Sequence, residues 1–511
     1  MKARLSIIVI VVNAVAALAL GLLVAVCVWL SGLVGDDGRD RQPVKNSDGS
    51  ISVLVDKKTL MDREKSIERI KTAEKAFRND ISDPRVYLRL PESEFFRSLF
   101  AYYFLSKIMS AKPVTLDKAI IDLFKERGQL LYSMDERYPL MKKSIYLDPR
   151  RKAYNRPAIR PGTNVIIIFV ESLSDFFLKE ELHGLRGLTG HINEMGNESF
   201  SFTRMRNASF PTIRGLIAAL GSGVYLLDEN IGGSRIPIPC RFLFLSNILK
   251  KKGYTTIHAQ AGSEHFIGMK DFFMKREGYD YFYGCESLIP RGIRDRENGF
   301  GVDDDVLFGF VVELLKKQPR NAPFLLTIST INSHPPFKVK ERHPGSDGNE
   351  MIDAIHSTDR AFGEFWEYFK KSPHADNTVV ILTADHAMGN NKQYIDFMKK
   401  HEDHFSPFFD IIPCYIHFPG GAYRGVKNDT LCTSMDLLPT LLEMMDMDLP
   451  NPFMGIPIFS ERKYYKNMDN PTGAMKLDQA TIAQAKKILA FYLNLYKEDR
   501  ILPKDYSVTL H

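Results

Sequence analysis

Two ionisable residues stand side by side after a run of β-branched and aliphatic residues. Residues 378–384 read T-V-V-I-L-T-A, and Asp385 and His386 follow directly. A carboxylate oxygen and an imidazole nitrogen fixed next to each other suit a divalent metal ion. The alternative is an aspartate that caps a helix, followed by a surface histidine. The rest of the chain must decide between these interpretations.

Two further apolar runs end in polar residues of the same kind. Glu171 follows N-V-I-I-I-F-V directly, and His334 lies shortly after P-F-L-L-T-I-S-T. Continuous aliphatic runs of this length are typical of strands buried on both faces of a parallel sheet. Because parallel strands bring their carboxyl ends to one edge, we expect these residues and the Asp385–His386 pair to converge. Together they favour a metal site, although each alone could be a cap or a loop residue.

A candidate nucleophile lies in the segment N-A-S-F-P-T-I-R-G, which precedes the apolar stretch L-I-A-A-L. Thr212 is predicted in the first turn of that helix, where backbone N–H groups and the helix dipole favour an anion. A metal ion at the same place would lower the pKa of its hydroxyl. Arg214 could bind a non-bridging phosphate oxygen. Ser209 is the alternative nucleophile, and helix capping is the alternative role for Thr212.

Strands and helices alternate along the chain around these residues. Strands are predicted at 164–170, 253–260, 323–330, 378–384 and 413–418, with helices before residue 252 and at 306–317 and 352–371. This alternation predicts an α/β fold with a doubly wound, mainly parallel sheet. We divide the chain into a cytoplasmic tip and transmembrane anchor (1–35), a linker and helical stalk (36–160), a catalytic domain (161–465) and a C-terminal helical tail (466–511).

The N-terminal segment predicts a membrane anchor. Residues 5–34 include no charged side chain, and crossing a bilayer takes roughly 20 apolar residues. Lys2 and Arg4 precede the segment, so the N-terminus is expected in the cytoplasm and the remainder outside it. A signal peptide, with an apolar core of about 7–15 residues, is the alternative. The sequence does not decide whether this helix is cleaved.

Charge and cysteine content narrow the class of protein. The 511 residues carry a net charge of +6, from 68 basic and 62 acidic residues. This excess is too mild to indicate a nucleic-acid-binding protein, but it suits work beside an anionic membrane. Disulfides are allowed outside the cytoplasm. The four cysteines beyond the anchor permit three pairings, which the sequence does not distinguish: Cys240, Cys285, Cys414 and Cys432.

Several motifs occur together and in order. They include F-V-E-S-L-S, P-T-I-R-G, E-G-Y-D-Y-F, S-H-P-P-F, T-A-D-H-A and S-M-D-L-L-P-T-L-L, within roughly residues 160–460. In this combination the sequence resembles the lipoteichoic acid synthase branch of the sulfatase/alkaline phosphatase superfamily. The resemblance implies the fold of that superfamily and one divalent metal ion, usually Mn²⁺, with Mg²⁺ or Zn²⁺ as alternatives. It also implies metal ligands and roles for the following residues: Glu171, Thr212, Asp385 and His386 as ligands, Thr212 as nucleophile, and His334 at the substrate's phosphate or head group.

The chain departs from the pattern of that family in places that concern the substrate. The family usually has five membrane spans, whereas one is predicted here. Its head-group pocket carries Trp and Arg before G-Y-D, where this chain has Gly268 and Lys270. Lys270 is therefore the candidate to bind the substrate, although lysine lacks the bidentate geometry of arginine. The motif at Thr212 is closer to the looser P-T-x-R-G of relatives, and it does not fit the sulfatase pattern S-x-P-S-R.

The sequence predicts a membrane-anchored, metal-dependent phosphotransferase of the cell envelope, with its catalytic domain in the periplasm or outside the cell. It would transfer a phosphoglycerol-type group from a phospholipid or lipid-linked donor to an envelope glycan or lipid, through a phosphothreonine at Thr212. The alternatives are a phosphoethanolamine transferase or phosphodiesterase of the same fold, a sulfatase, and a non-catalytic envelope binding protein. The donor, the acceptor, the native metal and the choice between transfer and hydrolysis stay open.

Overall fold

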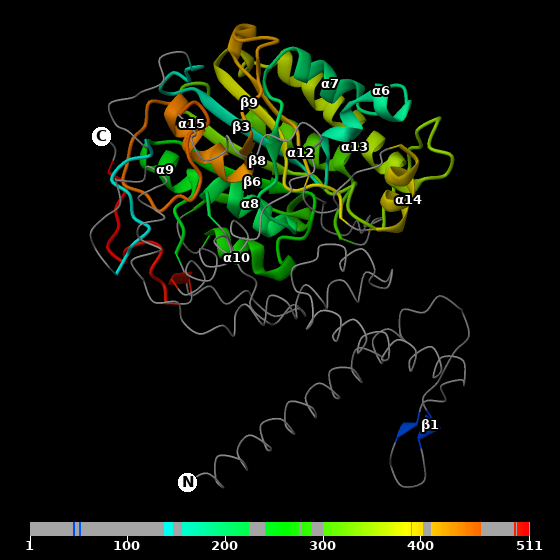
Figure 1. The fold of residues 1–511 in the computed structure, drawn as a ribbon, viewed down its shortest axis with the longest axis horizontal. Helices are drawn as coiled ribbons and strands as arrows, with labels where there is room; N and C mark the ends of the chain where they lie inside the picture. The colour runs from blue at the N-terminus through cyan, green and yellow to red at the C-terminus, as the bar shows by residue number, and fades with distance from the viewer. Residues whose placement is uncertain are drawn as a thin grey trace, which may run out of the picture. The chain divides into compact units, whose positions relative to one another are not determined.

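The computed structural model describes 44–45, 51–52, 137–146, 156–223, 241–274, 278–288, 300–389, 391–401, 410–460, 495–496 and 498–509. The chain divides into two compact units, Met1–Leu90 and Pro91–His511. In the first unit the described residues are β1 (Val44–Lys45) and β2 (Ile51–Ser52), which pair antiparallel. The other described elements belong to the second unit (Figure 1).

An eight-stranded sheet forms the centre of the second unit. Its order is β11 (Lys427–Asn428), β4 (Phe200–Phe202), β10 (Cys414–His417), β9 (Thr378–Ala384), β3 (Asn164–Val170), β8 (Phe324–Ser329), β6 (Thr255–Gln260) and β7 (Tyr281–Tyr283). All strands share one direction except β10, which runs antiparallel to both β9 and β4. The prediction of a mainly parallel α/β sheet is confirmed. The reversed direction of β10 was not anticipated, because hydrophobic periodicity does not encode strand direction.

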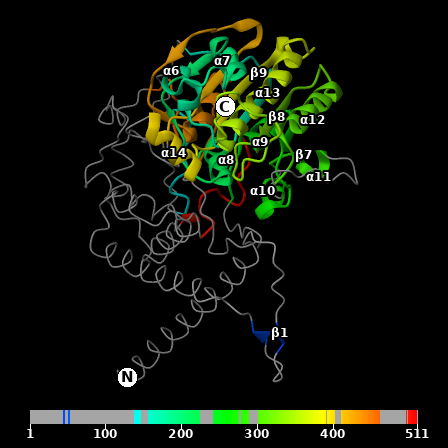
Figure 2. The same ribbon diagram turned by 90° about the vertical axis from the view of Figure 1, so that its right-hand side faces the viewer.

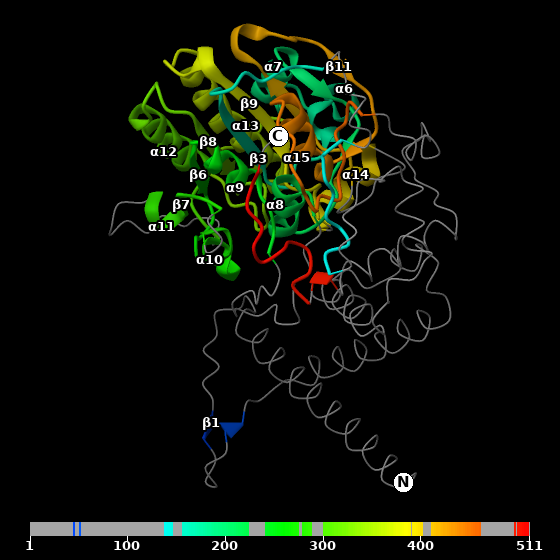
Figure 3. The same cartoon turned by 90° about the vertical axis from the view of Figure 1, so that its left-hand side faces the viewer.

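Helices cover both faces of this sheet (Figure 1, Figure 2 and Figure 3). One layer holds α7 (Gly190–Asn197), α12 (Asp304–Lys317) and α13 (Glu350–Lys370), and the other holds α8 (Thr212–Gly221), α9 (Leu245–Lys251) and α15 (Leu437–Met444). The strands β3, β8 and β9 are consequently buried along their whole length. The shorter elements are α6 (Glu180–His183), α10 (Met269–Met274), α11 (Cys285–Leu288), α14 (Lys392–His401) and the pair β5 (Met205–Arg206) and β12 (Cys432–Thr433).

Part of the segment that precedes β3 packs on the α15 side of the domain. Lys142 and Asn451 exchange two backbone hydrogen bonds, of 2.7 and 2.9 Å. The N–H of Ile159 donates to the carbonyl of Met444 at 2.8 Å. From the C-terminal tail, the hydroxyl of Tyr506 donates to the carbonyl of Pro450 at 2.6 Å. Residues assigned by sequence to the stalk and the tail therefore share the core of the catalytic domain.

Several predicted features lie outside the described residues. They are the apolar segment 5–34, the stalk before residue 137, Cys240 and most of the helix expected at 477–497. Among the residues that are described, no helix is both long and apolar enough to cross a bilayer. Cys285, Cys414 and Cys432 are buried, and burial raises the pKa of the Cys414 thiol to about 12.

Candidate metal centre and nucleophile

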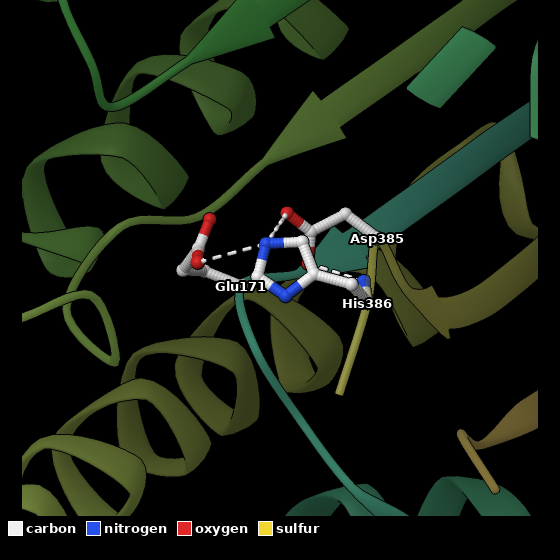
Figure 4. A group of neighbouring side chains, drawn as sticks. All are labelled: Glu171, Asp385 and His386. Carbon is white, nitrogen blue, oxygen red and sulfur yellow. Dashed lines mark hydrogen bonds and ion pairs between the residues drawn. The ribbon is translucent and has the colours of Figure 1, made fainter. Parts of the chain in front are cut away.

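Three ionisable side chains meet where two adjacent parallel strands end. Glu171 follows β3, and Asp385 and His386 follow β9, its parallel neighbour. One ligand atom from each residue lies within 4.8 Å of the others. Figure 4 shows the three side chains beside one another. Their exposed fractions are 2%, 1% and 2%. We call these three residues the metal centre; the structure brings them together as the sequence predicted.

Asp385 uses one carboxylate oxygen for the fold and leaves the other open. Its Oδ1 accepts hydrogen bonds from the backbone N–H of Ser172 at 3.0 Å and of His386 at 2.8 Å. Its Oδ2 is buried, has no hydrogen-bond partner among the described residues and lies 3.3 Å from Nε2 of His386. Because an unsatisfied buried oxygen of a charged group is costly, Oδ2 fits the role of a cation ligand.

Glu171 is fixed by its own loop and by the loop after β8. Its Oε1 accepts a hydrogen bond from the hydroxyl of Ser172 at 2.6 Å. Its backbone N–H donates to Oγ1 of Thr330 at 2.9 Å, and its carbonyl accepts from the hydroxyl of Ser333. Sequence analysis missed these supporting residues, because serine and threonine are common at strand ends and give no distinct signal there.

Thr212 is the first residue of α8, as predicted. Its Oγ1 donates a hydrogen bond to Oε2 of Glu171 at 3.0 Å and lies 3.4 Å from Nε2 of His386. The helix reaches this position because Gly215 lies directly against the end of β9. A Cβ atom at Gly215 would be only 2.2 Å from the carbonyl oxygen of Asp385. The glycine of the P-T-I-R-G motif therefore allows the nucleophile helix to approach the metal centre.

The other candidate residues near α8 are placed differently. Arg214 lies in the first turn of α8 and is partly buried. Ser209 accepts a hydrogen bond through its carbonyl from Nδ2 of Asn207 at 3.1 Å. None of the contacts found among the described residues joins the Ser209 hydroxyl to the metal centre. Thr212 is therefore the better placed of the two candidate nucleophiles.

His334 lies on the loop after β8, beside the metal centre. Its Nδ1 is 2.6 Å from the carbonyl oxygen of Pro335. The centroid of its ring is 4.6 Å from that of Phe300. A charge on His334 contributes to the electrostatics of Glu171, which places the imidazole within electrostatic range of the ligands. The neighbouring Ser333 donates to the carbonyl of Glu171, so the loop that carries His334 is joined to the metal centre.

Lys270 is paired with an acid that sequence analysis did not single out. Its Nζ is 2.8 Å from Oε2 of Glu264, whose side chain is 11% exposed. The loop that carries Glu264 also contacts Phe300, because the N–H of Ser263 donates to the Phe300 carbonyl at 3.3 Å. Phe300 in turn lies against the ring of His334. We call residues 263–270 together with Phe300 the rim. A lysine that is already paired offers a phosphate less positive charge than the arginine of the family pattern.

Burial and mutual charges shift the three pKa values at the centre in different directions. Burial would raise the pKa of Glu171, but positive charge on His386 and His334 holds it below its ordinary value. Burial, and then the charge of Glu171, raise the pKa of Asp385 to about 7. Burial opposes charging of His386, yet the two carboxylates raise its pKa. Two buried carboxylates that share one imidazole form an anionic site that a divalent cation would balance.

Comparison with known proteins assigns the chain to a family. The sequence model of the sulfatase family matches residues 163–447, and the chain belongs to this family. It is 26% identical over 313 residues to phosphoglycerol transferase I of Citrobacter koseri, an alignment that covers 57% of this chain and 38% of the relative. The chain therefore spans less than half the length of that relative. The family match and this relative confirm the resemblance that the motifs predicted.

One solved structure shows the same fold. A protein of the alkaline phosphatase superfamily from Vibrio parahaemolyticus superposes with a TM-score of 0.57 at 21% identity, over 76% of this chain and 98% of that one. A lipoteichoic acid synthase from Listeria monocytogenes has a TM-score of 0.49 at 19% identity, over 66% of this chain and 92% of that one.

Proposed function

We propose that this protein is a metal-dependent phosphotransferase of the cell envelope. It would move a phosphoglycerol-type group from a phospholipid or another phosphodiester donor to a glycan or lipid acceptor. The observation that carries the proposal is the hydrogen bond from Thr212 to Glu171 inside the cluster of buried ligands. A hydroxyl at a helix N-terminus, held against a metal-ligand set, is suited to attack phosphorus.

The residues of the centre fit one divalent ion. Glu171, Asp385 and His386 would supply two carboxylates and one imidazole, and Thr212 would be the fourth ligand. The open Oδ2 of Asp385 supports this assignment. We favour Mn²⁺, which accepts such oxygen-rich sets, with Mg²⁺ and Zn²⁺ as alternatives. When bound, the ion would stabilise negative charge on the threonine oxygen and on the phosphoryl group.

The first half-reaction follows from the position of Thr212. Its deprotonated Oγ1 attacks phosphorus, and the bond from phosphorus to the lipid alcohol breaks. His334 gives a proton to the departing alcohol oxygen. Arg214 binds a non-bridging oxygen, and the N-terminus of α8 adds its dipole. The product is a phosphothreonine that carries the head group.

The second half-reaction reverses these roles. An acceptor hydroxyl attacks the same phosphorus and passes its proton to His334, while the bond from Oγ1 of Thr212 to phosphorus breaks. If water takes the place of the acceptor, the outcome is hydrolysis. A phosphoethanolamine transferase is the second candidate, because the carboxylate of Glu264 in the rim could bind an ammonium group.

We also propose that residues 5–34 anchor the chain by a single helix, with the catalytic domain outside the cytoplasmic membrane. The length of this uncharged segment and the preceding Lys2 and Arg4 support that orientation. An anchor would raise the effective concentration of lipid-borne donors at the site.

The test is a search for the covalent intermediate. The full chain is incubated with Mn²⁺ and vesicles of phosphatidylglycerol and phosphatidylethanolamine, quenched in acid, and analysed by peptide mass spectrometry. We expect a phosphoglycerol adduct on Thr212, whereas a phosphoethanolamine adduct would favour the second candidate. Thr212→Ala should lose the adduct and about 10⁴-fold or more of turnover, while the fold and most of the metal binding are kept, because Glu171, Asp385 and His386 stay in place.

Ser209→Ala is the matched control, and it should keep both adduct and turnover. An adduct on Ser209, or near-normal turnover of Thr212→Ala, would contradict the proposal. Hydrolysis of p-nitrophenyl sulfate without any phosphodiester activity would indicate a sulfatase. A protein that binds no metal and is unaffected by chelator would indicate a non-catalytic binding protein.

A further inference from the structure

A buried carboxylate outside the metal centre holds the loop that leads to His334. Asp304, the first residue of α12, is fully buried. Its Oδ1 accepts a hydrogen bond from the N–H of Ile331 at 2.8 Å. Its Oδ2 accepts from the N–H of Asn332 at 3.3 Å and from Oγ1 of Thr358 at 2.7 Å. Three donors therefore converge on one carboxyl group, which we call the Asp304 clamp.

The clamp ties the loop to two helices. Asn332 returns a contact, because its Oδ1 accepts a hydrogen bond from the backbone N–H of Asp304 in α12 at 3.2 Å. Its Nδ2 donates to Oγ of Ser357 at 3.2 Å, and Ser357 and Thr358 both belong to α13. The loop is thereby fixed to the packed pair α12 and α13 rather than to the surface.

The loop held in this way touches both parts of the proposed chemistry. The N–H of His334 donates to the carbonyl of Ile331 at 2.8 Å, which closes a turn on the clamped residues. Ser333, between them, donates its hydroxyl hydrogen bond to the carbonyl of Glu171. Phe300, four residues before Asp304, lies against the ring of His334. A displacement of residues 331–332 would therefore move His334 relative to the metal centre.

Position 304 requires a carboxylate because its neighbours are hydrogen-bond donors. All three groups that face Asp304 are donors, so both of its oxygens must accept. Asparagine has nearly the same shape, but its NH₂ group would face an N–H or O–H donor. Burial raises the pKa of Asp304 to about 7, against the three hydrogen bonds that lower it. A buried carboxylate whose three partners are donors from the loop and from α13 indicates a role in geometry.

We propose that Asp304 is a positioning residue, which acts through residues 331–334 to keep His334 directed at the leaving-group oxygen. This rests on the proposed function, in which His334 transfers that proton. Nothing in the metal centre depends on Asp304 directly, so its loss should affect proton transfer and leave the metal ligands in place.

The first test compares two phosphodiesters in Asp304→Asn. With phosphatidylglycerol, whose leaving group is an alcohol, kcat should fall by about 10- to 100-fold with little change in KM. With bis-p-nitrophenyl phosphate, whose leaving group departs without a proton, the first-turnover burst of p-nitrophenol should keep the rate of the unmodified protein, because His334 is needed there only in the second half-reaction. A burst that slows as much as kcat on phosphatidylglycerol would overturn the proposal.

Two control variants separate positioning from stability and charge. Asp305→Asn removes the same charge at the exposed neighbouring position and should leave kcat unchanged. Thr358→Val removes one donor to Asp304 but keeps both bonds to the loop, so it should lower Tm without a comparable loss of kcat. A loss of kcat in Thr358→Val that matches Asp304→Asn would overturn the proposal.

A double-mutant cycle tests whether Asp304 acts through His334. In a His334→Ala background, Asp304→Asn should produce almost no further loss, because residues that act through one group are not additive. Losses that multiply would mean that Asp304 works by another route, and the proposal would be wrong.

Hydrogen exchange gives a readout that does not need activity. In the full chain, Asp304→Asn should speed exchange in the peptide 331–337, and Asp305→Asn should not. Unchanged exchange would overturn the clamp even in an active enzyme. A wild-type protein inactive on both diesters would instead overturn the proposed function. Faster exchange in Asp304→Asn would then still support the conclusion that Asp304 fixes the loop 331–334.

Discussion

The metal centre and the rim lie at the same edge of the sheet but differ in construction. At the centre every ligand is buried, and the surrounding backbone and hydroxyl groups fix its orientation. At the rim, Phe266 and Phe300 are exposed, and Lys270 is held by one ion pair with Glu264. A buried polar cluster tolerates few replacements, whereas solvent weakens a pair such as Lys270–Glu264, in which the lysine side chain is 36% exposed. We infer that the centre sets the class of reaction and that the rim selects the head group.

The largest effect is expected from removing a ligand at the centre. Asp385→Asn replaces one carboxylate oxygen by an NH₂ group. That oxygen is either Oδ2, which has no hydrogen-bond partner among the described residues, or Oδ1, which accepts from two backbone N–H groups. It should weaken Mn²⁺ binding by more than the roughly 100-fold typical of residues behind the ligands, and turnover should fall with it. Calorimetric titration of chelator-treated protein measures this. Lys270→Ala is the control at the rim, and equal weakening there would remove the distinction between the two regions.

The next effect concerns the packing that brings α8 to the centre. Gly215→Ala would place a methyl group 2.2 Å from the Asp385 carbonyl oxygen. Overpacking of this kind typically costs about 1–3 kcal/mol, and here it should also displace Thr212 and reduce turnover. Denaturant unfolding and turnover assays measure both effects.

Gly309→Ala is the matched control for this change. Gly309 also lies within a helix, α12, but an added Cβ there meets nothing within 4 Å. It should be neutral or stabilising by up to about 1 kcal/mol, the difference in helix propensity between the two residues. Similar destabilisation by both substitutions would show that the close approach at Gly215 is not the cause.

A smaller effect is expected at the rim. Glu264→Gln removes the partner of Lys270, so anionic head groups should gain relative to neutral ones. Because a partly exposed pair is worth about 0–1 kcal/mol, the ratio of kcat/KM values should shift by no more than about fivefold. Glu313→Gln, which breaks the exposed pair with Lys316, should leave the ratio unchanged. A large loss of kcat in Glu264→Gln would instead place the rim within the catalytic machinery.

The last prediction concerns stability rather than turnover or metal binding, and it involves a buried carboxylate outside the metal centre. Both oxygens of Glu443 are buried without hydrogen-bond partners among the described residues. Burial raises its pKa from 4.5 to about 7, although the charge of Arg156 opposes this. Because the folded state binds the proton more tightly than the unfolded state, stability should fall as pH rises from about 4.5 to about 7.

Glu443→Gln should remove this part of the pH dependence and leave Mn²⁺ binding unchanged. Tm values at pH 5 and pH 8 measure the difference between the two proteins. An identical pH dependence would show that Glu443 does not contribute. The pKa of Asp385 is also raised to about 7, but there Glu171 and His386 offer further ligand atoms within 4.8 Å.

The sequence by itself determined the strands and singled out the candidate ligands. The runs that became β3, β8 and β9 consist mostly of aliphatic and β-branched residues, and such strands must be covered on both faces wherever they lie. Asp385 and His386 are neighbours in the chain, so their proximity needed no folding. Thr212 begins a helix because local signals define helix starts. These properties depend on a few adjacent residues, which a sequence displays directly.

Only the tertiary structure decided how separate segments fit together. Three contacts join residues from different elements. Gly215 lies against the end of β9, Lys270 pairs with Glu264, and Asp304 accepts hydrogen bonds from the loop before His334. Their side chains are of common types at ordinary positions, so no local pattern distinguishes them. Close packing and the need to satisfy buried polar groups select such contacts, and both act only when the chain is folded.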